Sequence, residues 1–149
     1  MIYISHRGNI SGQNIDLENS PNYAVNALSS GYDVEVDVWF LDDKFYLGHD
    51  NPDHHVSKNF LLQKGLWCHA KNILALFEMS NLDIEHYFWH QKDCVTLTSS
   101  GYLWTFPGKE LTKKSICVMP ELMKNTNKIN QCAGICSDII SNYKMHKEK

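Results

Sequence analysis

A strictly alternating stretch, residues 33–39, constrains the fold of this chain more than any other feature. A period of two predicts a β-strand that carries its valines on one face and its polar residues on the other. The polar face carries Asp33, Glu35, Asp37 and Trp39. A solvent-exposed strand would be the ordinary interpretation of such acids. Like charges two residues apart on one face repel each other, however, and a strand does not need them.

The segments around this strand favour a functional site instead. His6-Arg7-Gly8 precedes it and His49-Asp50 follows it, each at the end of a predicted strand. Paired carboxylates with nearby histidines are what a divalent metal and a proton-transfer pair require. We therefore interpret the polar face as the site.

Periodicity, caps and turn residues predict strands that alternate with helices along the chain. The predicted strands cover residues 2–5, 33–40, 45–47, 66–71, 86–91, 95–98, 102–106, 115–119 and 134–138, and the predicted helices cover 21–30, 58–63, 72–80, 121–130 and 139–146. This order predicts a single α/β domain over residues 1–149. Polar residues collect at strand ends, which is typical of a parallel barrel. A complete barrel typically needs roughly 200 residues or more, so several crossover helices would be shortened or missing.

The turn predicted at Asp42-Asp43 sets the register of the strand that returns after it. Residue 49 would then lie opposite residues 36 and 37, and His49 would come back over the carboxylates.

Composition excludes several classes of function. The net charge is -3 with histidines neutral, so there is no broad basic field for nucleic acid or an anionic membrane. No apolar run is long enough for a membrane span, and the N-terminus has no signal-peptide pattern. Five cysteines without paired spacings argue against a disulfide framework and favour a reducing, cytoplasmic compartment. We expect Cys68, Cys117 and Cys136 to be core residues, and His86 to be exposed.

Four segments together resemble the glycerophosphodiester phosphodiesterase family, within the phosphatidylinositol-specific phospholipase C-like superfamily. They are His6-Arg7-Gly8, Leu17-Glu18-Asn19-Ser20, the 31–38 stretch with Glu35 and Asp37, and Gly48-His49-Asp50. The match is dense over residues 1–52. It is thinner later, where His69-Ala70-Lys71, Trp104-Thr105 and 134–138 resemble the family's remaining strands.

The resemblance implies a compact TIM-type (β/α)₈ barrel and metal-dependent cleavage of a glycerophosphodiester, or a related small phosphodiester, to glycerol 3-phosphate and an alcohol. Glu35 and Asp37 would hold a divalent cation, Mg²⁺ or Ca²⁺. Arg7 and Lys71 would bind the phosphate, and His6 and His49 would be the general acid/base pair.

One position departs from the family pattern. His69 stands where the family has a third acidic metal ligand, and imidazole suits Mn²⁺ or Zn²⁺ better than Ca²⁺. His69 is therefore a candidate third ligand that changes the expected metal.

Two alternatives stay open. The chain could be a relic barrel that binds a phosphate-bearing ligand without catalysis, although such a relic would be expected to lose His6 or His49 first. It could also cleave lysophospholipid or sphingomyelin head groups like a phospholipase D and form a cyclic phosphate. Asp138 is equally consistent with capping the following helix and with touching a ligand. Thin helical cover would leave apolar patches, which favours a homo-oligomer.

Overall fold

Short strands dominate the computed structural model, which describes residues 1–124 and 128–145. The strands are β1 (Ile2–His6), β2 (Asp33–Leu41), β3 (Lys44–Leu47), β4 (His54–Val56), β5 (Leu66–Ala70), β6 (His86–Trp89), β7 (Val95–Leu97), β8 (Leu103–Thr105), β9 (Ser115–Val118) and β10 (Gly134–Ser137). The α-helices in these ranges are α1 (Pro21–Ser29), α2 (Lys58–Leu61), α3 (Ile73–Ser80) and α4 (Ile140–Met145).

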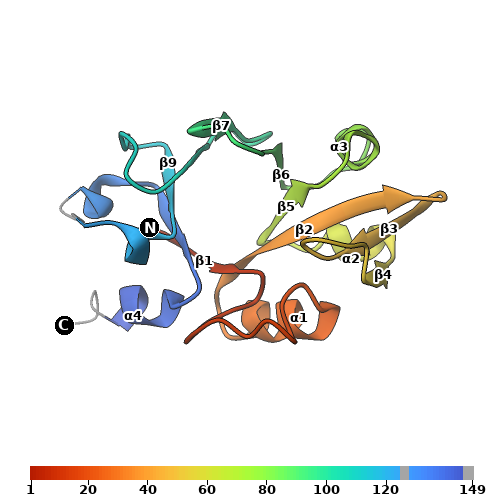
Figure 1. Ribbon diagram of the computed structural model, residues 1–149, viewed down its shortest axis with the longest axis horizontal. Coiled ribbons are helices and arrows are strands. Elements are labelled where there is room, and N and C mark those ends of the chain that lie inside the picture. Colours follow the sequence, from red (N-terminus) through yellow and green to blue (C-terminus); the bar gives the residue numbers. More distant parts are fainter. Residues whose placement is uncertain (125–127, 146–149) are drawn as a thin grey trace.

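The ten strands form one mixed sheet that curves into a half-barrel. Its parallel part runs β6-β5-β2-β1-β10-β9-β8. β3 and β4 add an antiparallel hairpin to the far end of β2, and β7 pairs antiparallel with β8. Figure 1 shows this curved sheet at the centre of the molecule, with the helices on its outside.

The expected TIM-type (β/α)₈ barrel is therefore wrong. In a closed barrel β6 would pair with the next parallel strand, but no ladder joins β6 to β7 or β8 in the described ranges. The chain between β6 and β8 has no helix with which to cross over, so β7 turns back on β8 instead. Two hydrogen bonds between Tyr87 and Ser99 bridge the opening at one point. We call this opening, between β6 and the β7–β8 pair, the seam.

The valines and the acidic residues of β2 lie on opposite faces of the sheet, as predicted. Its three valines are fully buried on the outer face of the sheet, where α1 and α3 pack against the strand. Glu35 and Asp37 lie on the inner face and are also buried, at 3% and 1% exposure. The predicted register of the hairpin is confirmed, because Val38 pairs with Leu47 and Gly48 N–H donates to Asp37 C=O.

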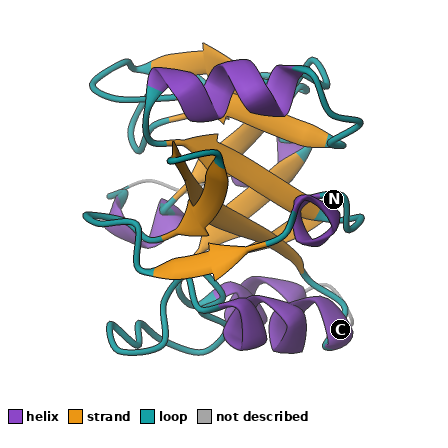
Figure 2. Ribbon diagram, turned by 90° about the vertical axis from the view of Figure 1, so that its right-hand side faces the viewer, coloured by secondary structure: helices purple, strands orange, loops and turns teal. Residues whose placement is uncertain are grey.

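Aromatic side chains fill the inner face below the carboxylates. Trp67, Phe88 and Trp104 come from three different strands and pack with Ile4 and Ile116. The ring centroids of Phe88 and Trp104 are 4.5 Å apart, across the seam. Side chains therefore hold the two edges together where the backbone ladder is missing. Figure 2 shows the strands crossing between helices on opposite sides of the molecule.

Helix α1 starts as the sequence predicts. Ser20 caps it by accepting a hydrogen bond from Tyr23 N–H, and Pro21 occupies its first turn. Ser20 directly follows Asn19, the last residue of the loop after β1.

Several local predictions are wrong. Within 121–130 the described residues form two single 3₁₀ turns, at 120–122 and 129–131, and residues 125–127 lie outside the described ranges. β4 falls in a segment predicted as loop. His86 is buried and stacks on Trp67, with ring centroids 3.9 Å apart. The last helix is confirmed over Ile140–Met145, and residue 146 of its predicted range lies outside the described residues.

The three cysteines expected in the core, Cys68, Cys117 and Cys136, are buried. Apolar residues are exposed on α3, namely Ile73, Leu74 and Phe77, and self-association stays a prediction. Across residues 1–124 and 128–145, no helix has the length and apolar character needed to cross a membrane.

Gly48 holds the end of the β2–β3 hairpin beside the inner face. Its φ is 152°, its C=O accepts a hydrogen bond from Trp39 Nε1, and an added Cβ would overlap the carbonyl oxygen of Asn51. We expect Gly48→Ala to destabilise the fold by more than about 3 kcal/mol in urea unfolding, because a backbone atom cannot move aside. The control is Gly101→Ala, whose Cβ would meet nothing within 4 Å and should cost only about 1–2 kcal/mol of backbone strain. Equal losses in the two variants would contradict this reading of Gly48.

Candidate functional site

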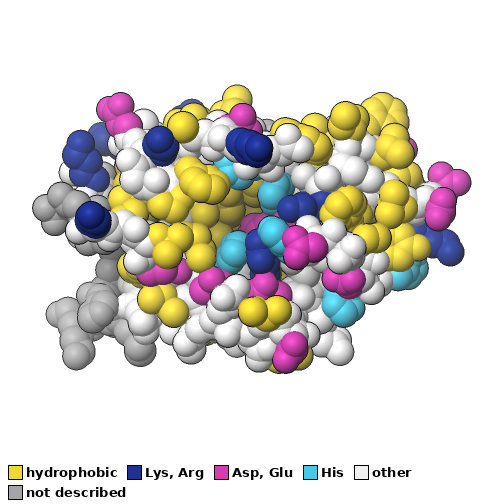
Figure 3. Space-filling view, in the orientation of Figure 1, with side chains coloured by type: hydrophobic (Ala, Val, Ile, Leu, Met, Phe, Trp, Pro, Cys, Tyr) yellow, Lys and Arg dark blue, Asp and Glu magenta, His cyan; other side chains and the backbone are white. Residues whose placement is uncertain are grey.

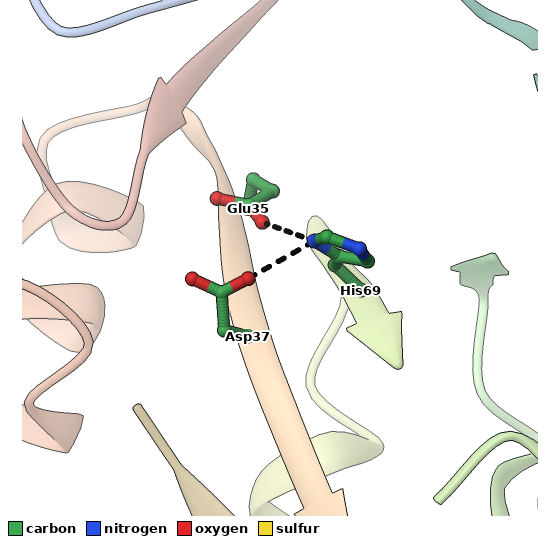
Figure 4. A group of neighbouring side chains, drawn as sticks. All are labelled: Glu35, Asp37 and His69. Carbon is green, nitrogen blue, oxygen red and sulfur yellow. Dashed lines mark ion pairs between the residues drawn. The ribbon is translucent and has the colours of Figure 1, made fainter. Parts of the chain in front are cut away.

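Strand register assembles the charged part of the site. His6 of β1 pairs with Glu35 of β2, and two residues further along β2, Asp37 pairs with His69 of β5. Parallel neighbours at the same level point to the same face, so these four side chains meet where β1 and β5 end, beside the first half and middle of β2. Figure 4 shows Glu35, Asp37 and His69 turned toward one another from β2 and β5.

His69 lies between the two carboxylates. Its Nδ1 is 3.0 Å from Asp37 Oδ1 and 3.6 Å from Glu35 Oε1. Its Nε2 is 2.7 Å from the carbonyl oxygen of His90, and its ring is stacked on Phe88. Burial lowers the pKa of His69, but the two carboxylates outweigh burial and raise this pKa to about 9.

Asp37 is enclosed by cations and amides. Asn19 donates from Nδ2 to Asp37 Oδ2 at 2.9 Å and accepts from Asp37 N–H at 2.8 Å. Arg7 Nε is 3.2 Å from Oδ2, and Lys71 Nζ is 3.7 Å from Oδ1. Burial alone would raise the pKa of Asp37, but His69, Arg7 and Lys71 hold this pKa well below its ordinary value.

Arg7 and Asn19 adopt left-handed backbone conformations, with φ of 53° and 59°. Non-glycine residues in this region are strained, and such strain clusters at functional sites. Arg7 is also held by Glu18, which accepts a hydrogen bond from Nη1 at 3.1 Å. The loop of residues 7–19 is therefore shaped around the β2 carboxylates.

His6 has a carboxylate partner from the other end of the chain. Its Nδ1 is 2.8 Å from Asp138 Oδ1, and the same oxygen accepts a hydrogen bond from Asn9 Nδ2. This leaves Nε2 of His6 facing inward, 3.9 Å from Glu35 Oε2. Burial lowers the pKa of His6, but the hydrogen bond from its ring to Asp138 and the charge of Glu35 raise it above its ordinary value. Asp138 thus orients His6, in addition to standing before α4.

His49 reaches the same pocket from the hairpin but not the carboxylates themselves. Its side chain is 42% exposed, and Nδ1 lies 2.8 Å from Asp50 Oδ1. No ion pair links His49 to Glu35 or Asp37 in the described structure. His6 and His49 therefore line the same pocket, but His6 is 15% exposed and pairs with Glu35, whereas His49 is more exposed and does not.

The site opens into a pocket of about 350 Å³. All seven predicted site residues line it: His6, Arg7, Glu35, Asp37, His49, His69 and Lys71. Apolar residues form the opposite wall, chiefly Trp104, Phe106, Val118 and Met119. Figure 3 shows charged and histidine side chains on one side of this hollow and hydrophobic side chains on the other.

His90 closes the wall at the seam. It is 8% exposed, its ring centroid lies 5.0 Å from that of Phe106, and neither ring nitrogen makes a hydrogen bond within the described residues. Asp93 is 3.9 Å from its Nδ1. A side-chain contact thus completes the pocket where no backbone ladder does.

The seven residues that the sequence predicts for the site line one pocket, but sequence reasoning missed several of their partners. Asn9 was not recognised, Asn19 and Asp138 had no defined role, and the apolar wall was not predicted. The usable signal was position, since Asp138 directly follows the last parallel strand and His6 ends the first. The remaining acid of the alternating face, Asp33, lies away from the pocket and accepts a hydrogen bond from Trp67 Nε1.

Glu35, Asp37 and His69 fit a divalent cation. Each offers one ligand atom, and these atoms lie within 4.8 Å of one another. Glu35 Oε2 and Asp37 Oδ1 are buried and accept no hydrogen bond from the described residues, although cationic side chains lie nearby. Buried carboxylate oxygens without hydrogen bonds are expected where a cation binds.

Comparison of the chain with protein-family models, with curated proteins and with solved structures finds no match.

The charged state of His69 gives a pH dependence of stability in metal-free protein. Its folded pKa of about 9 lies above its ordinary value of 6.5, so its stabilising effect is complete below pH 6.5 and is lost as the pH rises through 9. We expect the unfolding free energy of wild type to exceed that of His69→Asn most at pH 6. This difference should shrink by at most about 3 kcal/mol by pH 10. Urea unfolding across this range measures it, with exposed His55→Asn as the control, and a pH-independent difference would contradict the assignment.

Proposed function

We propose that this chain is a metal-dependent phosphodiester hydrolase that cleaves glycerophosphodiesters, or related small phosphodiesters, to glycerol 3-phosphate and an alcohol. One observation carries the proposal. A single pocket joins a buried carboxylate pair, two cations held beside it and two histidines. Each component has a separate task in phosphodiester cleavage.

Arg7 and Lys71 are suited to the phosphate. Both lie beside Asp37 on the pocket wall, and neither is free to swing away, because their side chains are only 16% and 18% exposed. Their positive charges would neutralise the charge that builds on the phosphoryl oxygens during cleavage. A bound divalent cation would polarise the same oxygens as a Lewis acid, held by Glu35, Asp37 and His69.

His6 and His49 are suited to proton transfer. In the proposed reaction one takes the proton from a substrate hydroxyl next to the phosphoester as that hydroxyl attacks phosphorus. The other gives a proton to the departing alcohol, and a cyclic phosphate results. Water then opens the ring, with the two histidines exchanging roles. Asp138 supports this step because it keeps Nε2 of His6 turned toward the pocket.

The pocket also bears on substrate size. A volume of about 350 Å³ suits a small organic phosphodiester, and the apolar wall offers a surface for its carbon skeleton. The cytoplasmic location and self-association stay parts of the proposal.

The deciding experiment is hydrolysis of glycerophosphocholine and glycerophosphoethanolamine by purified, metal-stripped protein. Mg²⁺, Ca²⁺, Mn²⁺ and Zn²⁺ are restored one at a time, and the products are identified by phosphorus NMR. We expect metal-dependent release of glycerol 3-phosphate. His6→Asn and Glu35→Gln should each lower kcat/KM by at least roughly 10²-fold, and His55→Asn should leave it unchanged.

The other outcomes have distinct meanings. No turnover with any metal, in protein that still binds phosphate, would overturn the hydrolase and favour a binding module. A cyclic phosphate as the stable product, formed from lysophospholipid, would favour the phospholipase D-like reaction.

Asp138 is a positioning residue with its own test. Asp138→Asn keeps the shape but removes the charge that holds His6, so we expect kcat to fall by roughly 10²-fold with little change in KM. The limb of the pH–rate profile that reports His6 should move to lower pH, because this residue's pKa loses a cause of its increase. Glu85→Gln, which alters a carboxylate–histidine pair outside the pocket, is the control. A lower kcat with an unmoved profile would indicate a merely structural role.

A further inference from the structure

Asp37 has a single oxygen to offer a cation. Oδ2 is already engaged by Asn19 Nδ2 at 2.9 Å and by Arg7 Nε at 3.2 Å. Oδ1 accepts no hydrogen bond from the described residues and lies 3.0 Å from His69 Nδ1 and 3.7 Å from Lys71 Nζ. Asp37 therefore acts as a one-oxygen ligand, and the site cannot gain oxygens by bidentate binding at this residue.

His69 is fixed as a nitrogen ligand. A carbonyl oxygen can only accept a hydrogen bond, so the 2.7 Å contact of Nε2 with His90 C=O requires a proton on Nε2. The neutral ring then presents its lone pair at Nδ1, the atom that faces both carboxylates. Phe88 lies parallel to the ring, with an interplanar angle of 7° and centroids 5.2 Å apart. A backbone acceptor that orients a histidine in this way is the usual outer contact of a metal-ligating imidazole.

The net charge around the site contributes little to the affinity for a cation. Glu35 and Asp37 contribute two negative charges, and Arg7 and Lys71 place two positive charges within 4 Å of Asp37. Mg²⁺ and Ca²⁺ are hard cations whose affinity depends on charged and neutral oxygens. The positive charges of Arg7 and Lys71 do not cancel the bond between a cation and an imidazole nitrogen. This bond favours first-row transition metals.

Thiols do not enter the donor set. In the described ranges the cluster of potential ligands contains Glu35, Asp37 and His69 and no cysteine. Two carboxylate oxygens with one imidazole nitrogen suit borderline dications rather than the soft ions that thiolates select.

We infer that His69 makes this site selective for a first-row transition-metal dication, of the Mn²⁺ to Zn²⁺ series, over Mg²⁺ and Ca²⁺. This inference rests on the metal-dependent function proposed for the same residues. Its readout is binding rather than catalysis.

Isothermal titration calorimetry of the metal-stripped full chain tests the inference, with MnCl₂, ZnCl₂, MgCl₂ and CaCl₂ each added alone. We expect Mn²⁺ and Zn²⁺ to bind at least about 10²-fold more tightly than Mg²⁺ and Ca²⁺. In His69→Glu, which supplies a third carboxylate, the Mn²⁺ to Mg²⁺ affinity ratio should fall by at least about tenfold. His55→Asn should keep the wild-type ratio. Equal affinity for Mg²⁺ and Mn²⁺ in wild type, an unchanged ratio in His69→Glu, or no binding at all would overturn the inference.

A second measurement needs no variant that might fail to fold. Electron spin-echo envelope modulation of the wild-type Mn²⁺ complex detects nitrogen bound directly to the ion. A coupling from one imidazole nitrogen supports His69 as a ligand, and its absence contradicts it.

Different results would contradict the proposed function and the inference about the metal. Diester hydrolysis by a Mg²⁺-selective protein would sustain the function and overturn the inference. Transition-metal selectivity without any diester hydrolysis would do the reverse.

Discussion

The carboxylate of Asp37 is the constraint on which the rest of the structure depends. A buried carboxylate is strongly unfavourable unless charges and hydrogen bonds compensate it. Here the compensation comes from two segments: the loop after β1, with Arg7 and Asn19, and the end of β5, with His69 and then Lys71. The parallel pairing of β1, β2 and β5 brings these groups to the two carboxylate oxygens of Asp37. The left-handed backbone of Arg7 and Asn19 contributes as well. Fold and site therefore share one set of interactions.

Local sequence predicted the parts of this arrangement that depend on local rules. The alternation of residues 33–39 determined which side chains of β2 face inward, and the turn at Asp42-Asp43 determined the hairpin register. Charged residues at the same level of neighbouring parallel strands had to gather on one face, as His6, Glu35, Asp37 and His69 do. Local rules alone did not predict that Asp138 would hold His6, because 132 residues separate them and the pairing of β1 with β10 brings them together.

Closure of the sheet was the larger error, and its cause is global. Helix and strand patterns are read one segment at a time, whereas closing a barrel depends on strand tilt, shear and a crossover at every step. The family resemblance was dense only over residues 1–52. After β6 the chain has no crossover helix, and β7 pairs antiparallel with β8. His86 illustrates the same difficulty at one residue: its polarity suggested exposure, but stacking on Trp67 and a hydrogen bond to Ser100 bury it.

Because of the seam between β6 and the β7–β8 pair, one half of the pocket accommodates substitutions more readily than the other. Each charged residue is tied to a backbone ladder or to a partner that compensates its charge, so a substitution there disturbs several groups at once. The boundary at the seam is instead a contact between the rings of His90 and Phe106. A change of side-chain volume at residue 106 can widen or narrow the aperture without breaking a strand pair. The set of molecules that fit the pocket could thus change while its charged half stays the same.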